Sequence, residues 1–236
     1  MLEKVIFILI AFVSNIVQAA SGFGGTVIAM PFSIRLIGLT KSRAVLNAVG
    51  FLVSLIVAVF NLKKIVWKEV LKIVIFMSIG LVCGYFISMI NLPDIIFRIY
   101  GVIIVIIAVF LFFKKDSINI PKFISYIILI FAGIFHYLYI SGGPFLVIYA
   151  ELNLKEKEEF RATLSFSWVI LDGVILVENT INKVWNGEIL ILLLIVFVTS
   201  ILAIFIGRFI ERHSNQKLFN KITCILLIIA GISCIF

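Results

Sequence analysis

Long apolar runs separated by short polar segments fill this chain of 236 residues from end to end. A run of about 20 apolar residues is long enough to cross the ~30 Å hydrocarbon core of a bilayer as a helix. Lipid offers the backbone no hydrogen-bonding partner, so such runs predict helices and not open sheets. The pattern therefore predicts an all-α polytopic membrane protein, with helices at about 4–20, 27–37, 43–62, 69–90, 95–113, 122–139, 145–152, 160–181, 188–210 and 218–236.

Two of these expected helices, 27–37 and 145–152, are too short to span the bilayer. A glycine pair precedes each of them inside apolar sequence. Because a glycine costs roughly 1 kcal/mol in a helix interior, we expect the helix to break at each pair and to continue as a short re-entrant arm. After the first arm we expect a polar turn at 38–42. The two interrupted segments are Ser21-Gly22-Phe23-Gly24-Gly25-Thr26 and Tyr139-Ile140-Ser141-Gly142-Gly143-Pro144.

The chain also repeats itself. A shift of 118 positions, without gaps, superimposes a glycine pair, an arginine, an asparagine and a tryptophan on identical residues. The matched positions are Gly24 and Gly142, Gly25 and Gly143, Arg43 and Arg161, Asn61 and Asn179, and Trp67 and Trp185. We therefore divide the chain into two halves, 1–117 and 118–236. Each half is expected to hold a broken, re-entrant helix hairpin followed by three transmembrane helices.

Composition and charge support this interpretation and add an orientation. The chain is 63% hydrophobic and 14% charged, whereas a soluble domain is about 45–50% apolar and about 25% charged. If each hairpin starts and ends on one face, six lysines and arginines lie on the face of the termini and fourteen on the other. Cytoplasmic loops carry the excess of these residues, so both termini are expected outside the cytoplasm and the second half is expected to be inverted. The net charge of +8 then reflects topology and not nucleic-acid binding.

The chain resembles the TauE/SafE sulfite exporter family, also called the four-toluene sulfonate uptake permease family. The resemblance rests on Gly22-Phe23-Gly24-Gly25 with Pro31 downstream, on Gly142-Gly143-Pro144, and on the Arg-Ala segment that follows each glycine motif. It implies transport of small anions, mostly sulfite, sulfonates and organosulfur acids, across the cell membrane, without a cofactor. Members commonly carry a fuller glycine string in the second motif, and its absence here suggests a differently lined substrate pocket.

Inverted repeats with broken helices are typical of secondary transporters whose site lies near the membrane midplane. The first N–H groups of a helix lack an internal partner and carry partial positive charge, so two arms that start at the breaks can hold an oxyanion between them. Close packing of helices at glycines remains the alternative. The predicted substrate-binding residues are Ser21, Gly22, Gly24, Gly25, Thr26, Ser141, Gly142, Gly143, Asn47 and Ser165.

Four ionisable residues are candidates for gating or proton coupling. Arg43 and Arg161 match under the repeat and are expected to guide or gate anions, or to anchor their helices at the interface. Asp172 lies in mid-span, where a carboxylate is costly and often functional. His136 precedes the second break by one turn and could titrate near neutral pH. A structural hydrogen-bonding role is the alternative for both.

Two other functions compete with a carrier. An anion channel would share the composition and is separated from a carrier only by accumulation against a gradient. An intramembrane enzyme is disfavoured, because the sequence contains neither G-x-S-x-G nor H-E-x-x-H. The expected partners are a small anion, protons as the candidate coupling ion and the lipid bilayer, with no nucleic acid. The exact anion, the direction of transport and the oligomeric state stay open.

Overall fold

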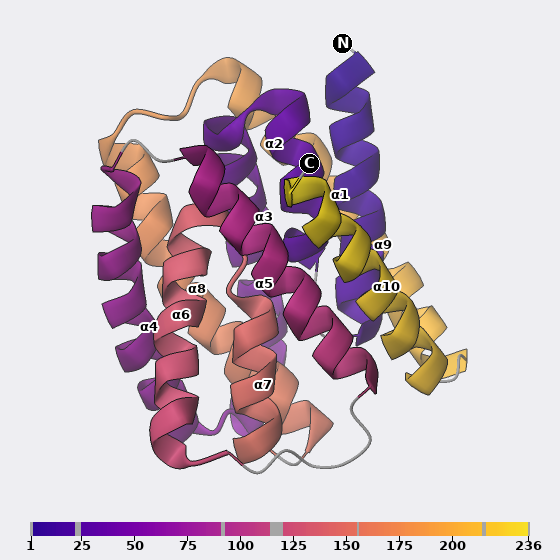
Figure 1. Ribbon diagram of the computed structural model, residues 1–236. Coiled ribbons are helices and arrows are strands. Elements are labelled where there is room, and N and C mark those ends of the chain that lie inside the picture. The colour runs from indigo at the N-terminus through magenta and orange to yellow at the C-terminus, as the bar shows by residue number, and fades with distance from the viewer. Residues whose placement is uncertain are drawn as a thin grey trace.

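A computed structural model describes residues 2–21, 25–90, 93–113, 120–154, 156–213 and 216–235, and within them it contains helices and no strand. The all-α prediction is confirmed. Figure 1 shows the helices running roughly alongside one another. Their bounds are α1 Leu2–Ser21, α2 Gly25–Ile37, α3 Leu39–Phe60, the 3-10 turn η1 Leu62–Lys64, α4 Trp67–Ser88, α5 Pro93–Phe113, α6 Lys122–Tyr139, α7 Gly143–Asn153, α8 Lys157–Ile181, α9 Gly187–His213 and α10 Gln216–Ile235.

Seven helices of the described chain, namely α1, α3, α4, α5, α6, α8 and α9, are long and apolar enough to cross a membrane. This confirms a multi-pass membrane protein. The helices α2 and α7 are short, with 13 and 11 residues, as their sequences predict. Large apolar side chains are exposed along the outer helices, for example Leu194 and Phe205 on α9. A surface of this kind suits contact with lipid.

Helices from the two parts of the chain pack against each other in matching pairs. The shift of 118 residues, with about five extra residues in the second half before α10, relates α1–α5 to α6–α10. The contact of α1 with α9 has its counterpart in the contact of α6 with α4, and that of α2 with α10 in that of α7 with α5. The repeat relates α3 to α8 and α5 to α10, so the contacts α3–α8 and α5–α10 each join two corresponding helices. The main helix contacts therefore follow the repeat seen in the sequence.

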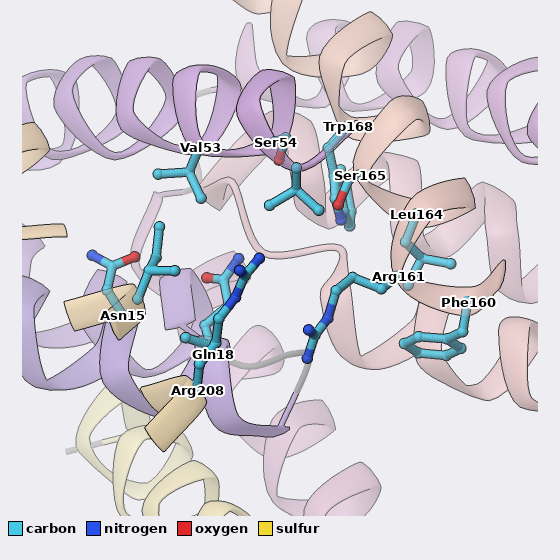
Figure 2. A pocket seen from close by; sticks show the side chains of 13 residues that line it. Asn15, Gln18, Val53, Ser54, Phe160, Arg161, Leu164, Ser165, Trp168 and Arg208 are labelled. Atoms are coloured by element: carbon cyan, nitrogen blue, oxygen red, sulfur yellow. The ribbon is translucent and has the colours of Figure 1, made fainter. Parts of the chain in front are cut away.

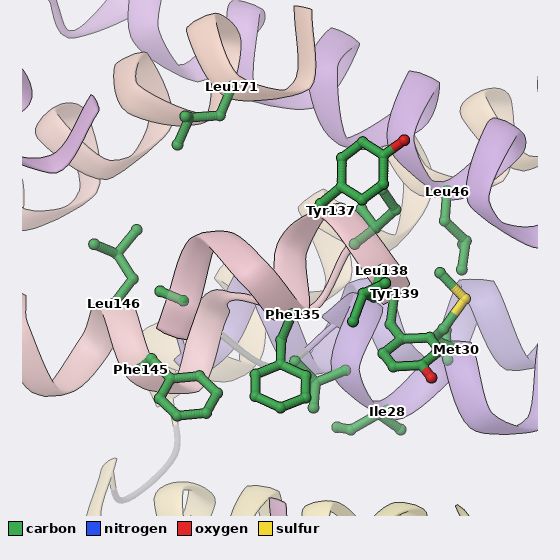
Figure 3. Packing of buried hydrophobic residues seen from close by; sticks show 14 of the residues in the cluster. Ile28, Met30, Leu46, Phe135, Tyr137, Leu138, Tyr139, Phe145, Leu146 and Leu171 are labelled. Carbon is green, nitrogen blue, oxygen red and sulfur yellow. The ribbon is translucent and has the colours of Figure 1, made fainter. Parts of the chain in front are cut away.

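Glycines bring α4 and α6 into close contact. A Cβ atom added at Gly80 on α4 would lie 2.1 Å from the carbonyl oxygen of Ile130, and one added at Gly133 on α6 would lie 2.1 Å from that of Met77. Small residues let the backbones of membrane helices approach in this way. The α6–α7 hairpin is further tied together by Phe135 and Phe145, whose stacked rings lie 5.5 Å apart (Figure 3).

The structure corrects one expected turn and refines one break. The predicted polar turn at 38–42 is wrong: Gly38 alone turns the chain, at φ 82°, and α3 begins at Leu39. The break between α6 and α7 is confirmed, but the left-handed residue is Ile140, at φ 51°, and not a glycine. The amide of Ile140 donates to the backbone oxygen of His136, four residues earlier, which closes the end of α6 in an αL-type cap, and the amide of Ser141 donates to the backbone oxygen of Phe135.

Candidate functional site

A central cavity, here called the central chamber, lies where the two short helices begin. It encloses about 520 Å³ of atom-free space, counting the part open to solvent. Helices α1, α2, α3, α6, α7 and α8 contribute to its wall. Its glycine and polar lining residues, with the indole of Trp168, are Gln18, Gly25, Thr26, Gly50, Ser54, His136, Gly143, Trp168 and Asp172. Five of the residues predicted from the sequence therefore meet around one cavity.

The first turns of α2 and α7 both face this chamber. Gly25 and Thr26 open α2, and Gly143 opens α7. A Cβ atom added at Gly143 would find only a methyl carbon of Val27, at 3.9 Å, which leaves this glycine open toward the cavity. Helix N-termini present unpaired N–H groups and partial positive charge, and two of them converge on this cavity.

One buried ionisable pair lines the chamber. Nε2 of His136 on α6 lies 2.9 Å from Oδ1 of Asp172 on α8, and the two side chains are 3% and 4% exposed. The imidazole also lies against Trp168, with ring centres 4.6 Å apart. Among the described residues that line the chamber, His136 and Asp172 are the only ionisable ones. A hydrogen-bonded imidazole and carboxylate can hold and pass a proton.

Asn47 supports this pair from α3. Its side-chain Nδ2 donates to the backbone oxygen of Asp172 at 3.1 Å, which fixes α3 against α8 at the level of the carboxylate. The other carboxylate oxygen, Oδ2, lies 3.4 Å from where a Cβ of Gly50 would be. Asn47 is fully buried and does not line the chamber. The geometry makes it a residue that positions Asp172.

A second cavity, here called the arginine vestibule, adjoins the central chamber (Figure 2). The two share Gln18, Ser54, Leu164 and Trp168 as lining residues. The vestibule encloses about 650 Å³ of atom-free space, again counting open solvent. Arg161 and Ser165 on α8, both predicted from the sequence, lie here together with Arg208 on α9. Two guanidinium groups thus place positive charge beside the chamber.

Arg43, the counterpart of Arg161, belongs to a different cluster. Its guanidinium lies 4.8 Å from the ring centre of Tyr137. The hydroxyl of Tyr137 donates to Oε1 of Glu178 at 2.5 Å. Within the described residues, Nε and Nη2 of Arg43 are buried without a hydrogen-bond partner. The cluster connects the ends of α3, α6 and α8, and Tyr137 directly follows His136.

The sequence matches the family described as Sulfite exporter TauE/SafE over residues 7–234. The chain belongs to the TauE/SafE family. Membership implies membrane transport of sulfite- or sulfonate-type anions. The family is one of transporters and not of enzymes, which confirms the non-enzymatic prediction. No curated protein and no solved structure matches the chain.

The remaining predicted residues of this TauE/SafE protein either do not line the chamber or lie outside the residues that the structure describes. The hydroxyl of Ser141 is buried and donates to the backbone oxygen of Tyr139 at 2.7 Å. Gly142 packs against α6, where an added Cβ would lie 2.5 Å from the carbonyl oxygen of Ala132. The side chain of Ser21 and the residues Gly22 and Gly24 lie outside the described residues. No group of three or more potential metal ligands occurs in the part of the chain that the structure describes.

Several residues of these sites escaped the sequence interpretation, among them Gln18, Ser54, Tyr137 and Glu178. Gln18 and Ser54 line both cavities, and Tyr137 and Glu178 hold the cluster around Arg43. Glutamine and serine are ordinary residues in an apolar helix, so composition gives no signal for them. The repeat does: position 18 corresponds to His136 and position 54 to Asp172. For Tyr137 and Glu178 no spacing pattern exists, because their contact joins separate helices.

Proposed function

We propose that this TauE/SafE protein is a secondary transporter that carries a small sulfur-containing oxyanion by alternating access, with the central chamber as its binding site. One observation carries the proposal: α2 and α7, from the two halves of the chain, begin at the same chamber. Their N–H groups and the hydroxyl of Thr26 offer neutral donors to an oxyanion. No lysine or arginine is among the described residues of the chamber wall. A site of neutral donors binds an anion and still releases it.

We further propose that 1–117 and 118–236 are inverted repeats and that both termini lie outside the cytoplasm. The matched helix contacts support the repeat, and the distribution of lysine and arginine supports the orientation. In this orientation the arginine vestibule opens toward the cytoplasm and the cluster around Arg43 lies toward the exterior. Arg161 and Arg208 then collect anions on one side, and Arg43 with Tyr137 and Glu178 closes the other.

His136 and Asp172 are proposed to couple transport to protons. An ionised carboxylate in the chamber repels an incoming anion, and the repulsion is strong because the membrane interior has a low dielectric constant. A proton taken up by the pair removes this repulsion. Binding of the anion and binding of the proton therefore favour each other, and the two move in the same direction.

Reconstituted protein in liposomes tests the proposal. Radiolabelled sulfite and methanesulfonate are offered outside, with the external solution more acidic than the lumen. We expect accumulation above the external concentration, and its loss when a protonophore collapses the gradient. Flux that only runs down the anion gradient would identify a channel. Absence of any flux of both anions, with correctly inserted protein, would overturn the proposal.

A further inference from the structure

The wall of the central chamber is built from positions that correspond under the repeat. A shift of 118 residues relates Gln18 to His136 and Ser54 to Asp172, and it relates Gly25 to Gly143. All six residues line the chamber. Corresponding positions of the two halves thus line one shared cavity, and the side chains that each half contributes can be compared.

The two halves supply different chemistry. His136 and Asp172 are ionisable and contact each other at 2.9 Å. Gln18 and Ser54 are neutral at every physiological pH. Among the hydrogen bonds between described residues, none uses the side chain of Gln18 or Ser54. An amide offers two N–H donors and a hydroxyl offers one, so the first half presents free donors where the second half presents a bonded acid–base pair.

Gln18 and Ser54 also stand where the chamber meets the vestibule, because both residues line both cavities. Gln18 lines a third, smaller cavity as well, next to Thr26 and Gly50. Its side chain lies over the start of α2: Oε1 of Gln18 lies 2.1 Å from where a Cβ of Gly25 would be. Figure 2 shows Gln18 and Ser54 with the arginines of the vestibule. An anion that leaves these arginines for the chamber therefore passes the two side chains, and Gln18 lies beside the N-terminus of α2.

We infer that Gln18 and Ser54, with the first turn of α2, form the anion subsite of the chamber, and that this subsite takes singly charged oxyanions such as a sulfonate or hydrogensulfite. The inference rests on the proposed function and assigns anion binding and proton binding to different halves of the chain. The first half holds the anion, and the second holds the proton. A doubly charged anion is excluded because neutral donors in a low-dielectric site compensate one charge far better than two.

Calorimetric titration of the purified full chain with methanesulfonate tests the subsite. The variants are Ser54→Ala, Gln18→Leu and Gln18→Glu. The control is Ser33→Ala on α2, since Ser33 is also buried but donates to the backbone oxygen of Ala29 and lines none of the three cavities. Loss of a hydrogen bond to a charged ligand predicts binding weaker by about ten- to a hundredfold in Ser54→Ala and Gln18→Leu. Gln18→Glu, which adds a negative charge, should bind no methanesulfonate.

The pH profile separates the two halves. Ser54→Ala and Gln18→Leu should weaken binding equally at each pH, whereas Asp172→Asn should flatten its pH dependence. Affinity within twofold of the native value in both Ser54→Ala and Gln18→Leu would overturn the subsite while leaving the proposed transport intact. If Gln18→Leu does not fold, Ser54→Ala decides, because it removes a single oxygen. Sulfate bound as tightly as methanesulfonate would overturn the charge selection. A native protein that binds neither sulfonate nor sulfite would overturn the proposed function itself.

Discussion

Two neighbouring glycines at the α6–α7 break differ in their surroundings: Gly142 is tightly packed against α6, whereas Gly143 is open toward the chamber. Substitution of each glycine therefore tests packing at Gly142 and ligand access at Gly143. A Cβ at Gly142 would lie 2.5 Å from the carbonyl oxygen of Ala132 and 3.0 Å from Cβ of His136. The φ of Gly142 is −72°, which alanine adopts freely, so the cost is one of packing alone. Overpacking of a buried site costs about 1–3 kcal/mol. At Gly143 the added Cβ meets only Val27, at 3.9 Å, and we expect no loss of stability.

Thermal unfolding of the two variants in detergent measures the difference. A loss of 1 kcal/mol lowers the melting temperature by about 2–4 °C for a chain of this size, so Gly142→Ala should melt roughly 2–12 °C below the native protein. Gly143→Ala should melt with the native protein, and the larger Gly143→Val should narrow the chamber at the first turn of α7 and abolish anion binding in a folded protein. Equal stability of Gly142→Ala and the native protein would refute the close contact with α6. Native affinity in Gly143→Val would place the anion elsewhere.

Three further predictions concern coupling, access and topology. Asp172→Asn and His136→Gln should each uncouple transport from the pH gradient while anion binding survives; unchanged pH dependence of liposome uptake in both would remove the pair from the mechanism. Arg208→Gln should slow uptake from the vestibule side and weaken its salt dependence, since an exposed guanidinium acts by attracting anions; an uptake rate and salt profile equal to the native ones would contradict this. Cysteine labelling at each terminus should occur from outside intact cells, and a terminus protected from an impermeant reagent would refute the orientation.

The positions of the helices along the chain were accessible from the sequence because they depend on local signals. Run length fixed the long helices, and the glycine pairs located the starts of α2 and α7 within two residues. The turn at 38–42 failed because polarity alone does not end a helix. The buried hydroxyl of Ser42 donates to the backbone oxygen of Gly38 at 2.7 Å, so Ser42 stays helical while the left-handed Gly38 makes the turn.

The chamber was accessible only in part, because its residues come from six helices. His136 and Asp172 were found singly, as ionisable residues in apolar sequence, but their contact at 2.9 Å is a tertiary fact. Gln18 and Ser54 carry no charge, and their position becomes informative only beside their counterparts in the other half. Ser141 and Gly142 illustrate the reverse case: they belong to the predicted motif, yet the cap of α6 and the contact with Ala132 account for them.

The packing of α1 against α9 and of α6 against α4 has a consequence for how the protein folds during synthesis. The most extensive partner of α1 is α9, which begins more than 160 residues later at Gly187. During synthesis the first helices therefore enter the membrane long before α9 exists, and until then the side chain of Asn15 lacks its partner on α9. Only when α9 arrives can Asn15 donate to Ser200, at 3.0 Å. The first helices of the chain therefore complete their packing only after the last helices have been made.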